Sequence, residues 1–339
     1  MQVAARPLVS VLVPFHNEKT FVKKRIINLN EIKYQNKEII FSNNFSTDGS
    51  GKIVKTTKVS CKNLIYITQK KEIGAEKNWE ICLKRSKGKY VMFAAMDDFH
   101  NPLFISKGVE FLEKNPSFDC WMPQVKFIDF KGKKHTRDKK NSVILPVQNM
   151  SYTKRLMYCI DGNTNFFPYA LFQGDKLRNV PLAELMETPS FEQPFLFYIF
   201  CKFKIYVDRL PLITYRLKIN VPTKIDLQRK IPDRIEKDSP YPPYHVVPEI
   251  KRLITLVRRI YPQRPFLLVL TRAVVLAGIF RSSWCSKEWY GRIKNTLWAD
   301  IIQCIKNRSF EDLLYLSLFV PLKVKPFRIL VAQHRKYCI

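Results

Sequence analysis

The sequence predicts an α/β protein built on a mixed, mainly parallel sheet flanked by helices, with a helical extension at its C-terminal end. Three observations support this fold class. Apolar stretches of strand length alternate with stretches in which apolar residues recur every three or four positions. Clusters of Asn, Ser, Asp and Gly follow the strand-like stretches and are typical of turns. Hydrophobic residues make up 46% of the 339 residues, which is enough for a buried core and argues against disorder.

The chain opens with a Val-rich stretch, Val9 to Val13, which is typical of a first strand buried on both faces. A helix is predicted next, because apolar residues recur there at helical spacing: Phe21, Val22, Ile26 and Leu29. We expect its opposite face to be polar and solvated, with Lys23, Lys24 and Arg25. This strand and helix form the first half of a βαβ unit with a right-handed crossover.

The remaining strands and helices are predicted from the same two kinds of pattern, short apolar stretches and apolar residues at helical spacing. Short apolar or β-branched stretches predict strands at residues 38–42, 64–68, 90–95, 119–130, 165–172, 204–208 and 212–217. Helical spacing predicts helices at residues 51–59, 75–86, 104–115, 152–160 and 191–203. The turn formers from Asn43 to Ser50 supply a helix N-cap, and Gly88 is a stop signal after the third helix.

Two adjacent carboxylates, Asp97 and Asp98, follow the strand at residues 90–95. Ligands of open α/β sheets bind beyond the carboxyl ends of strands, and paired carboxylates there suit a divalent cation that carries phosphate. The same two residues also fit a solvated turn before Pro102. The pattern alone leaves both interpretations open.

The chain is strongly basic, with 58 Lys and Arg against 29 Asp and Glu, a formal net charge of +29. Such an excess indicates an anionic partner: a nucleotide, a nucleic acid or an acidic membrane surface. We find no recognisable nucleic-acid-binding motif beside the charge, so no nucleic-acid partner is expected. The basic loop at residues 131–140 fits either a solvated loop or a binding strip.

Cysteine usage and the N-terminal sequence predict a cytoplasmic protein. Eight cysteines occur without a CxxC pair or metal-ligand spacing, which is typical of reduced thiols. The first apolar stretch, Leu8 to Phe15, contains Pro14 and has only the length of a strand, so we predict no secretory signal.

Composition divides the chain into three predicted parts: an α/β domain at residues 1–220, a connector at 221–248 and a basic helical region at 249–339. Six prolines fall in the connector and predict extended, irregular backbone. The apolar helix predicted at 266–280 in the last region is interrupted by Arg272 and is shorter than the ~20 residues that span a bilayer. Its basic flanks fit either ordinary helical packing or contact with an anionic membrane surface, which would make the protein peripheral on the cytosolic face.

Five segments, taken in order, resemble the family 2 glycosyltransferases, which are inverting nucleotide-sugar enzymes with the GT-A fold. The segments are SVLVPFHNE, EIIFSNNFSTDGS, GAEKNW, GKYVMFAAMDDFHNP and FFPYALFQGDKLR, and the resemblance covers about residues 8–220. It implies a hexosyltransferase-type enzyme. Its donor would be a UDP-linked sugar, and its acceptor a polysaccharide or lipid-linked oligosaccharide of the cell envelope.

The resemblance also implies a donor site. The matching positions are Pro14, His16, Glu18, Asn43, Asp48, Gly74, Lys77, Asn78 and Asp97. Asn43 replaces an aspartate that commonly reads the uracil edge in the family, and Asn both donates and accepts hydrogen bonds. Lys77 stands where an arginine is frequent, and it would meet a diphosphate as a point charge without a bidentate fork.

The family's metal motif matches with a departure, because Met96 occupies the first acidic position. The resemblance implies Asp98 as the direct ligand of Mg2+ or Mn2+, and Asp97 as a contact to the sugar, the ribose or a metal-bound water. Such an ion stabilises the charge that develops on a departing nucleoside diphosphate.

An inverting transfer also needs a base, and the resemblance places Glu192 in that role. The family's usual base position holds Gln193, which cannot take a proton; Glu187 and Glu184 are the reserve candidates. Glu192 also fits a carboxylate placed at a helix N-terminus by the macrodipole. Lys218 replaces the histidine of the family's closing motif, so no late histidine ligand is expected.

Two alternative functions stay open. A nucleotidyltransferase would carry a glycine-rich phosphate loop, and this chain has only 10 glycines and no such loop. A non-catalytic GT-A-like module that binds nucleotide or an anionic polymer is favoured by Asn43, Met96 and Gln193. It is opposed by the acids that are kept in place: Asp97, Asp98 and Glu192.

Overall fold

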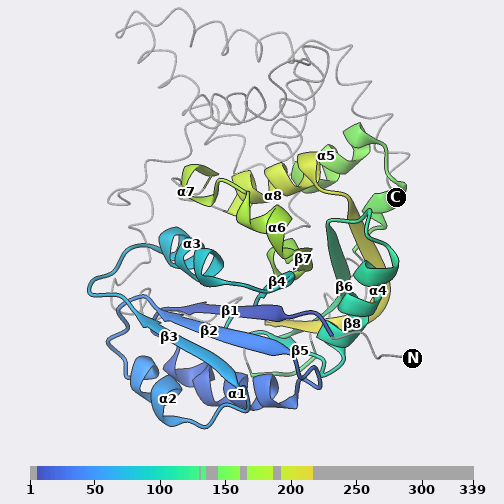
Figure 1. Ribbon diagram of the computed structural model, residues 1–339. Coiled ribbons are helices and arrows are strands. Elements are labelled where there is room, and N and C mark those ends of the chain that lie inside the picture. The colour runs from blue at the N-terminus through green and yellow to red at the C-terminus, as the bar shows by residue number, and fades with distance from the viewer. Residues whose placement is uncertain (1–5, 130, 135–143, 161–165, 186–191, 217–339) are drawn as a thin grey trace, which may run out of the picture. The chain divides into compact units, whose positions relative to one another are not determined.

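An eight-stranded sheet in the order β3-β2-β1-β4-β7-β6-β8-β5 forms the centre of the fold (Figure 1). The computed structural model describes residues 6–129, 131–134, 144–160, 166–185 and 192–216. The chain divides into two compact units, Met1–Lys224 and Ile225–Ile339, and the described residues all belong to the first. The predicted connector and the predicted basic helical region therefore lie outside the described residues.

The strands are β1 (Val9–Phe15), β2 (Lys37–Asn43), β3 (Asn63–Thr68), β4 (Tyr90–Phe93), β5 (Phe99–His100), β6 (Cys120–Ile128), β7 (Leu171–Gln173) and β8 (Ile205–Arg216). The α-helices are α1 (Lys19–Glu31), α2 (Ser50–Thr56), α3 (Ala75–Arg85), α4 (Phe104–Lys114), α5 (Tyr152–Ile160), α6 (Gly174–Arg178), α7 (Leu182–Leu185) and α8 (Glu192–Lys202). Two 3-10 turns are η2 (Val147–Asn149) and η3 (Phe167–Tyr169). Within the described ranges, no helix is long and apolar enough to cross a membrane.

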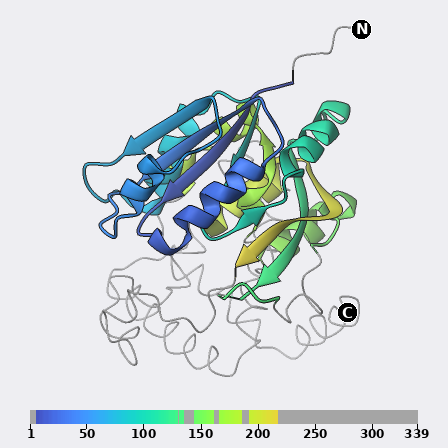
Figure 2. The ribbon, with the colours of Figure 1, turned by 90° about the horizontal axis from the view of Figure 1, so that it is seen from below.

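The half of the sheet formed by β3, β2, β1 and β4 is parallel throughout, as the alternating pattern predicted. Every residue of β2 is buried and β1 is nearly so, because helices cover both faces of this half. Helices α1 and α2 lie on one face and α3 lies on the other (Figures 1 and 2). The strand ends of this half are therefore aligned, and the loops that follow them gather at one edge.

The other half is mixed and corrects three predictions. The described part of the stretch at residues 165–172 is not one strand, because Pro168 lacks an N–H donor and lies within the turn η3, ahead of the short strand β7. The two strands predicted at 204–208 and 212–217 form the single strand β8, whose pairing with β6 shifts register around Gln124. The two-residue strand β5, antiparallel to β8, was not predicted at all.

Arg25 contradicts the prediction of a polar face that includes it, because its side chain is fully buried. The position lies three residues after Val22 and four before Leu29, so it falls on the inward side of α1. Lys23 and Lys24 are exposed as predicted. A buried guanidinium needs partners, and those of Arg25 lie at the candidate site described below.

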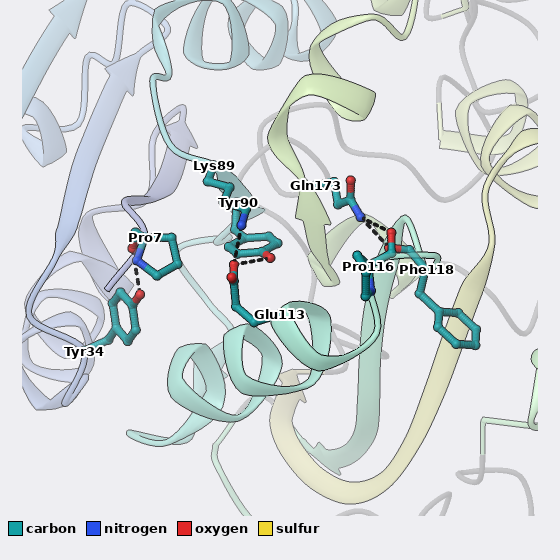
Figure 3. A network of polar contacts seen from close by, with 8 residues as sticks. All are labelled: Pro7, Tyr34, Lys89, Tyr90, Glu113, Pro116, Phe118 and Gln173. Carbon is teal, nitrogen blue, oxygen red and sulfur yellow. Dashed lines mark hydrogen bonds and ion pairs between the residues drawn. The ribbon is translucent and has the colours of Figure 1, made fainter. Parts of the chain in front are cut away.

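Polar contacts fasten α4 to the amino end of β4, away from the loops that follow the strands (Figure 3). The Tyr90 hydroxyl donates to Glu113 Oε1 over 2.6 Å, and Lys89 Nζ lies 2.6 Å from the same oxygen. Hydrogen bonds from Lys89 and Tyr90 lower the pKa of Glu113, while burial raises that of Tyr90. Tyr34 and Gln173 add bonds to backbone carbonyls in the same region. These contacts lie at the amino ends of the parallel strands, whereas the polar loops lie at the opposite edge of the sheet.

Among the residues that the structure describes, two other than glycine have positive φ, and both lie in those loops: Asn17 at 54° and Phe45 at 56°. Asparagine tolerates this region, but a bulky aromatic there is strained by about 1–2 kcal/mol. The Phe45 side chain is also 46% exposed, so burial does not explain its place. Surrounding hydrogen bonds must hold the backbone in this conformation.

We predict that Phe45→Gly is more stable than Phe45→Ala by about 1 kcal/mol, because both remove the ring and only glycine relieves the positive φ. Urea unfolding of the two variants measures the difference. Equal stabilities would show that the backbone at Phe45 is not strained.

Candidate functional site

Asn44 joins three of the loops at the carboxyl edge of the parallel strands. Its N–H donates to the Phe15 carbonyl at 2.9 Å, and its Oδ1 accepts the Ile73 N–H at 2.9 Å. Its own carbonyl accepts a hydrogen bond from His16 Nδ1 at 2.7 Å. The residue is 2% exposed. Sequence reasoning did not single out Asn44, although its place as the second asparagine after a buried strand was a usable signal.

His16 and Asn17 form the next link. Asn17 Nδ2 donates to His16 Nε2 at 2.9 Å, and His16 Nδ1 donates to the Asn44 carbonyl. Asn17 Oδ1 accepts the Thr47 N–H at 2.8 Å, and its backbone N–H donates to Ser46 Oγ at 3.0 Å. Both ring nitrogens of His16 form hydrogen bonds with other loop residues, so His16 helps to fix the loop conformation. Asn17 was also missed by sequence reasoning.

Asp48 fastens the beginnings of two helices. Its Oδ2 accepts the Lys19 N–H at the start of α1, and its Oδ1 accepts the Ser50 N–H at the start of α2, both at 2.9 Å. Burial alone would raise the pKa of Asp48, but hydrogen bonds from Ser50 and Lys19 outweigh it and lower the pKa below its ordinary value. Asp48 therefore holds the starts of α1 and α2 in place.

Three predicted donor-site residues lie at the start of α3. Asn78 is buried and pairs with Ser42, accepting from its hydroxyl at 2.6 Å and donating to its carbonyl at 2.9 Å. Gly74 precedes the helix with a φ of 86°, which favours glycine. Lys77 is exposed on the first turn. Asn78 therefore positions α3 against β2, and Lys77 is left accessible to an anion.

Asn43 lines a cavity of about 510 Å³ between the loop after β2 and the outer face of α2. The lining residues are Asn43, Ser46, Thr47, Gly49, Gly51, Lys52, Lys55 and Thr56. The Asn43 side chain is 8% exposed, and its Oδ1 accepts the Ser46 N–H at 2.9 Å. The volume falls within the range of small-molecule sites.

The acidic turn after β4 is held by two arginines from distant parts of the chain. The backbone N–H of Arg216 donates to Asp98 Oδ1 at 2.7 Å, and Arg216 Nε donates to the Asp97 carbonyl at 3.1 Å. On the other side, Arg25 Nη1 donates to the Asp98 carbonyl at 2.9 Å. The Asp97 residue is 9% exposed and Asp98 2%. The open alternative of a solvated turn is therefore wrong for both residues.

A buried polar cluster surrounds Arg25. Its guanidinium also donates to Asn28 Oδ1 at 3.0 Å and to His100 Nδ1 at 3.2 Å, and Asn28 Nδ2 donates to the His100 carbonyl at 2.8 Å. Burial lowers the pKa of Arg25 to about 10, although the charges of Asp98 and Asp97 raise it. Arg25 is thus still a cation at neutral pH. Its guanidinium is close enough to both aspartates for their charges to act on it.

The donor set suits a hard divalent cation that is shared with a phosphate ligand. Within the described ranges, no three His, Cys, Asp or Glu side chains gather where they could hold a metal. Mg2+ and similar ions commonly take one or two carboxylates and complete their coordination with substrate phosphates and water. Asp97 and Asp98 fit that arrangement.

Other predicted residues fall at the rim or beyond the described side chains. Pro14 is half-buried in β1, and Glu18 precedes α1, where its carbonyl accepts the Phe21 N–H at 2.9 Å. Glu192 is the first residue of α8, but its side chain and that of Glu184 lie outside the described part of the structure. Glu187 lies in an undescribed segment. These candidates stay predictions.

Parallel strands whose polar loops and acidic turn meet at one edge are typical of an α/β domain of the GT-A type. The family model for glycosyl transferase family 2 matches residues 10–175, and the chain belongs to this family. The predicted family and fold class are thereby confirmed.

Relatives agree with this assignment. The chain is 33% identical over 109 residues to an uncharacterized glycosyltransferase of Haemophilus influenzae, covering 32% of this chain and 34% of the relative. It is 27% identical over 176 residues to an uncharacterized glycosyltransferase of Rickettsia prowazekii, covering 49% of this chain and 52% of the relative. The matches thus span a third to a half of these relatives' own length. The crystal structure of S. aureus TarS 1-349 in complex with UDP-GlcNAc shares the fold, with a TM-score of 0.56, 14% identity and coverage of 86% and 81%.

We predict that Arg25→Leu lowers the free energy of unfolding by about 3 kcal/mol, because the Asp98 carbonyl and His100 Nδ1 lose a buried donor. Lys24→Leu is the matched control on the same helix turn and should change stability by less than about 0.5 kcal/mol. Urea denaturation measures both. Equal effects would contradict a special role for the buried guanidinium.

We predict that Asp48→Ala destabilises the protein by about 1 kcal/mol at neutral pH, since it removes acceptors at two helix starts. The folded pKa of Asp48 lies below its ordinary value of 3.8. The contribution is therefore present above that value and lost as the pH falls through the folded pKa. Thermal unfolding from pH 7 to pH 3 should show the gap to wild type closing at the acid end. A gap that does not change with pH would refute the charge-dependent part.

Proposed function

We propose that this protein is an inverting glycosyltransferase, moving a sugar from a nucleotide-sugar donor to a polysaccharide or lipid-linked oligosaccharide. The observation that carries the proposal is the acidic turn at Asp97 and Asp98, held at the carboxyl edge among the polar loops after β1, β2 and β3. Ligands of open α/β sheets bind at this edge. The fold and the family membership support the same reaction class.

The acidic pair would hold Mg2+ or Mn2+. The family resemblance alone favoured Asp98 as the direct ligand and Asp97 as the contact to sugar, ribose or water. The geometry favours the reverse division, since one oxygen of Asp98 accepts the Arg216 amide and Asp97 is the more exposed of the two. When bound, such an ion would stabilise the charge on the departing diphosphate.

Other residues of the chain would bind the donor and take the proton from the acceptor. Lys77, exposed at the start of α3, would meet the diphosphate as a positive charge. Asn43 would contact the base, and the loops fixed by Asn44 and Asn17 would exclude water from around it. Glu192 would take the proton from the acceptor hydroxyl as it attacks from the far side of the sugar.

The net charge of +29 supports an acceptor near an anionic surface. We propose a cytoplasmic enzyme that works at the cytosolic face of a membrane, where lipid-linked acceptors reside. The second candidate function is a GT-A-like module that binds nucleotide without turnover. It is favoured by Gln193, which cannot act as a base.

The proposal is tested by release of nucleoside diphosphate from a panel of UDP- and GDP-sugars, using the full chain and a membrane fraction that supplies acceptors. We expect turnover with Mn2+ or Mg2+ and none with EDTA. Asp97→Asn should lower kcat/KM by at least about a hundredfold, because a lost metal ligand removes several kcal/mol of transition-state stabilisation.

Asp175→Asn is the control, since Asp175 is an exposed acid on α6. It should leave turnover unchanged. Metal-dependent nucleotide binding without any turnover would support the binding module, and turnover unaffected by Asp97→Asn would contradict the assigned metal site.

A further inference from the structure

We infer that the outer face of α1 and α2 is the surface by which this protein binds an anionic membrane. The face is made of the exposed residues of α1, of α2 and of residues 57–62, and we call it the lysine face. The inference rests on the proposed function, which puts the acceptor at a membrane, and it names the surface that makes the contact.

The lysine face is strongly positive. Its exposed lysines are Lys19, Lys23, Lys24, Lys52, Lys55, Lys58 and Lys62. The same segments contain a single acid, Glu31, and their one arginine, Arg25, is buried. The face therefore attracts anions with almost no opposing negative charge of its own.

Helices elsewhere on the sheet balance their lysines with acids. On α3, Lys84 Nζ lies 2.6 Å from Glu80 Oε1. On α4, Lys114 Nζ lies 2.9 Å from Glu110 Oε1. Within the described ranges, no side chain of the lysine face forms an ion pair. A general abundance of lysine would affect all helices alike, so the scarcity of acids is a property of this face.

Hydrogen bonds join the two helices into one continuous surface. Asn30 Nδ2 on α1 donates to the Lys58 carbonyl at 3.2 Å, and the Ser60 N–H donates to Asn30 Oδ1 at 2.8 Å. Helices α1 and α2 also lie side by side on the same face of the sheet (Figure 1). Lysines of both helices can therefore contact one flat partner, and their attractions to it add.

An exposed apolar side chain lies among these lysines. Ile27 is 58% exposed, more than any other large hydrophobic side chain of the described residues. It follows Lys23 by four residues and Lys24 by three, so the three side chains are neighbours on the surface of α1. Lysines around an exposed apolar residue are typical of a helix that lies on a bilayer, where the ammonium groups meet lipid headgroups and the apolar side chain enters the acyl boundary.

The composition of the face favours a lipid surface over nucleic acid. Its exposed cations are all lysines, whereas bidentate recognition of phosphates and bases favours arginine. The only aromatic residue of these segments, Phe21, is buried. The face therefore lacks the stacking side chains with which proteins bind single strands.

The lysine face begins at the candidate site. The Asp48 carboxylate accepts the N–H groups of Lys19 and Ser50, so α1 and α2 start next to each other at the carboxyl edge of the sheet. A membrane in contact with this face would lie beside the edge where we propose that the donor binds. A lipid-linked acceptor would then reach the donor while its lipid stays in the bilayer.

The test is flotation of the full chain with vesicles of phosphatidylcholine, with and without phosphatidylglycerol, in the absence of donor and metal. We expect binding only to vesicles that contain phosphatidylglycerol, and weaker binding at high salt. The triple variant Lys23→Gln/Lys24→Gln/Lys58→Gln should weaken binding at least about tenfold, because each lysine near an anionic surface strengthens it about fivefold. Ile27→Gln should weaken binding at least about threefold, because the apolar side chain no longer leaves water.

The matched control is the triple variant Lys84→Gln/Lys87→Gln/Lys176→Gln, which removes the same charge from exposed lysines outside the lysine face. It should bind within about twofold of the wild type, because charges further from the membrane than a Debye length are screened. Equal losses in the two triple variants would show that only net charge matters and would overturn the inference. Binding that does not depend on phosphatidylglycerol would also overturn it.

A nucleic-acid partner gives a different result. If the wild type binds poly(U) but not the anionic vesicles, and the lysine-face variant loses that binding, the inference is overturned. The flotation assay uses no donor, so its failure leaves the proposed transfer reaction standing. A failure to release nucleoside diphosphate would instead overturn the proposed function, whatever the vesicles show.

Discussion

The acidic turn at Asp97 and Asp98 depends on the two arginines that enclose it. Two adjacent carboxylates at 9% and 2% exposure have little contact with water and need hydrogen-bond donors or positive charge nearby. Arg25 reaches the turn from α1 and Arg216 from the end of β8. The Arg216 guanidinium also lies over the rings of Phe21 and Phe99, 5.4 and 5.5 Å from their centroids. The same contacts that hold the acids therefore tie the two halves of the sheet together.

A second polar network sets the shape of the loops where we propose that the nucleotide binds. Asn44, Asn17 and Asp48 connect the loops after β1, β2 and β3 through backbone N–H groups and carbonyls. Phe45, whose φ is 56°, lies between Asn44 and Ser46 of this network. Loops fixed in this way are ordered before a ligand arrives, so less conformational entropy is lost on binding. The acidic turn and these loops together give one edge of the sheet a rigid polar rim.

The sequence predicted the structure best where apolar residues recur at strand or helix spacing. The parallel half of the sheet, α1, α3, α4 and α5 followed from spacing, and Asp97 and Asp98 stood out because acid follows a buried strand. Strand β5 was missed because two residues carry no period, and the two segments of β8 were read as separate because Pro211 lies between them. Arg25 was misplaced because its charge suggested a solvated face, although its helical spacing places it inward; its partner Asp98, 73 positions away, could not be found from local spacing. Family resemblance supplied the candidate roles, which composition and spacing could not.

The most direct test of the central claim is a crystal structure of the full chain soaked with Mn2+ and a nucleoside diphosphate, with anomalous scattering to locate the ion. The account predicts one manganese peak bound by a carboxylate oxygen of Asp97 or Asp98 and by the diphosphate, with the base beside Asn43. Manganese or nucleotide bound elsewhere, with the acidic turn left without an ion, would contradict it.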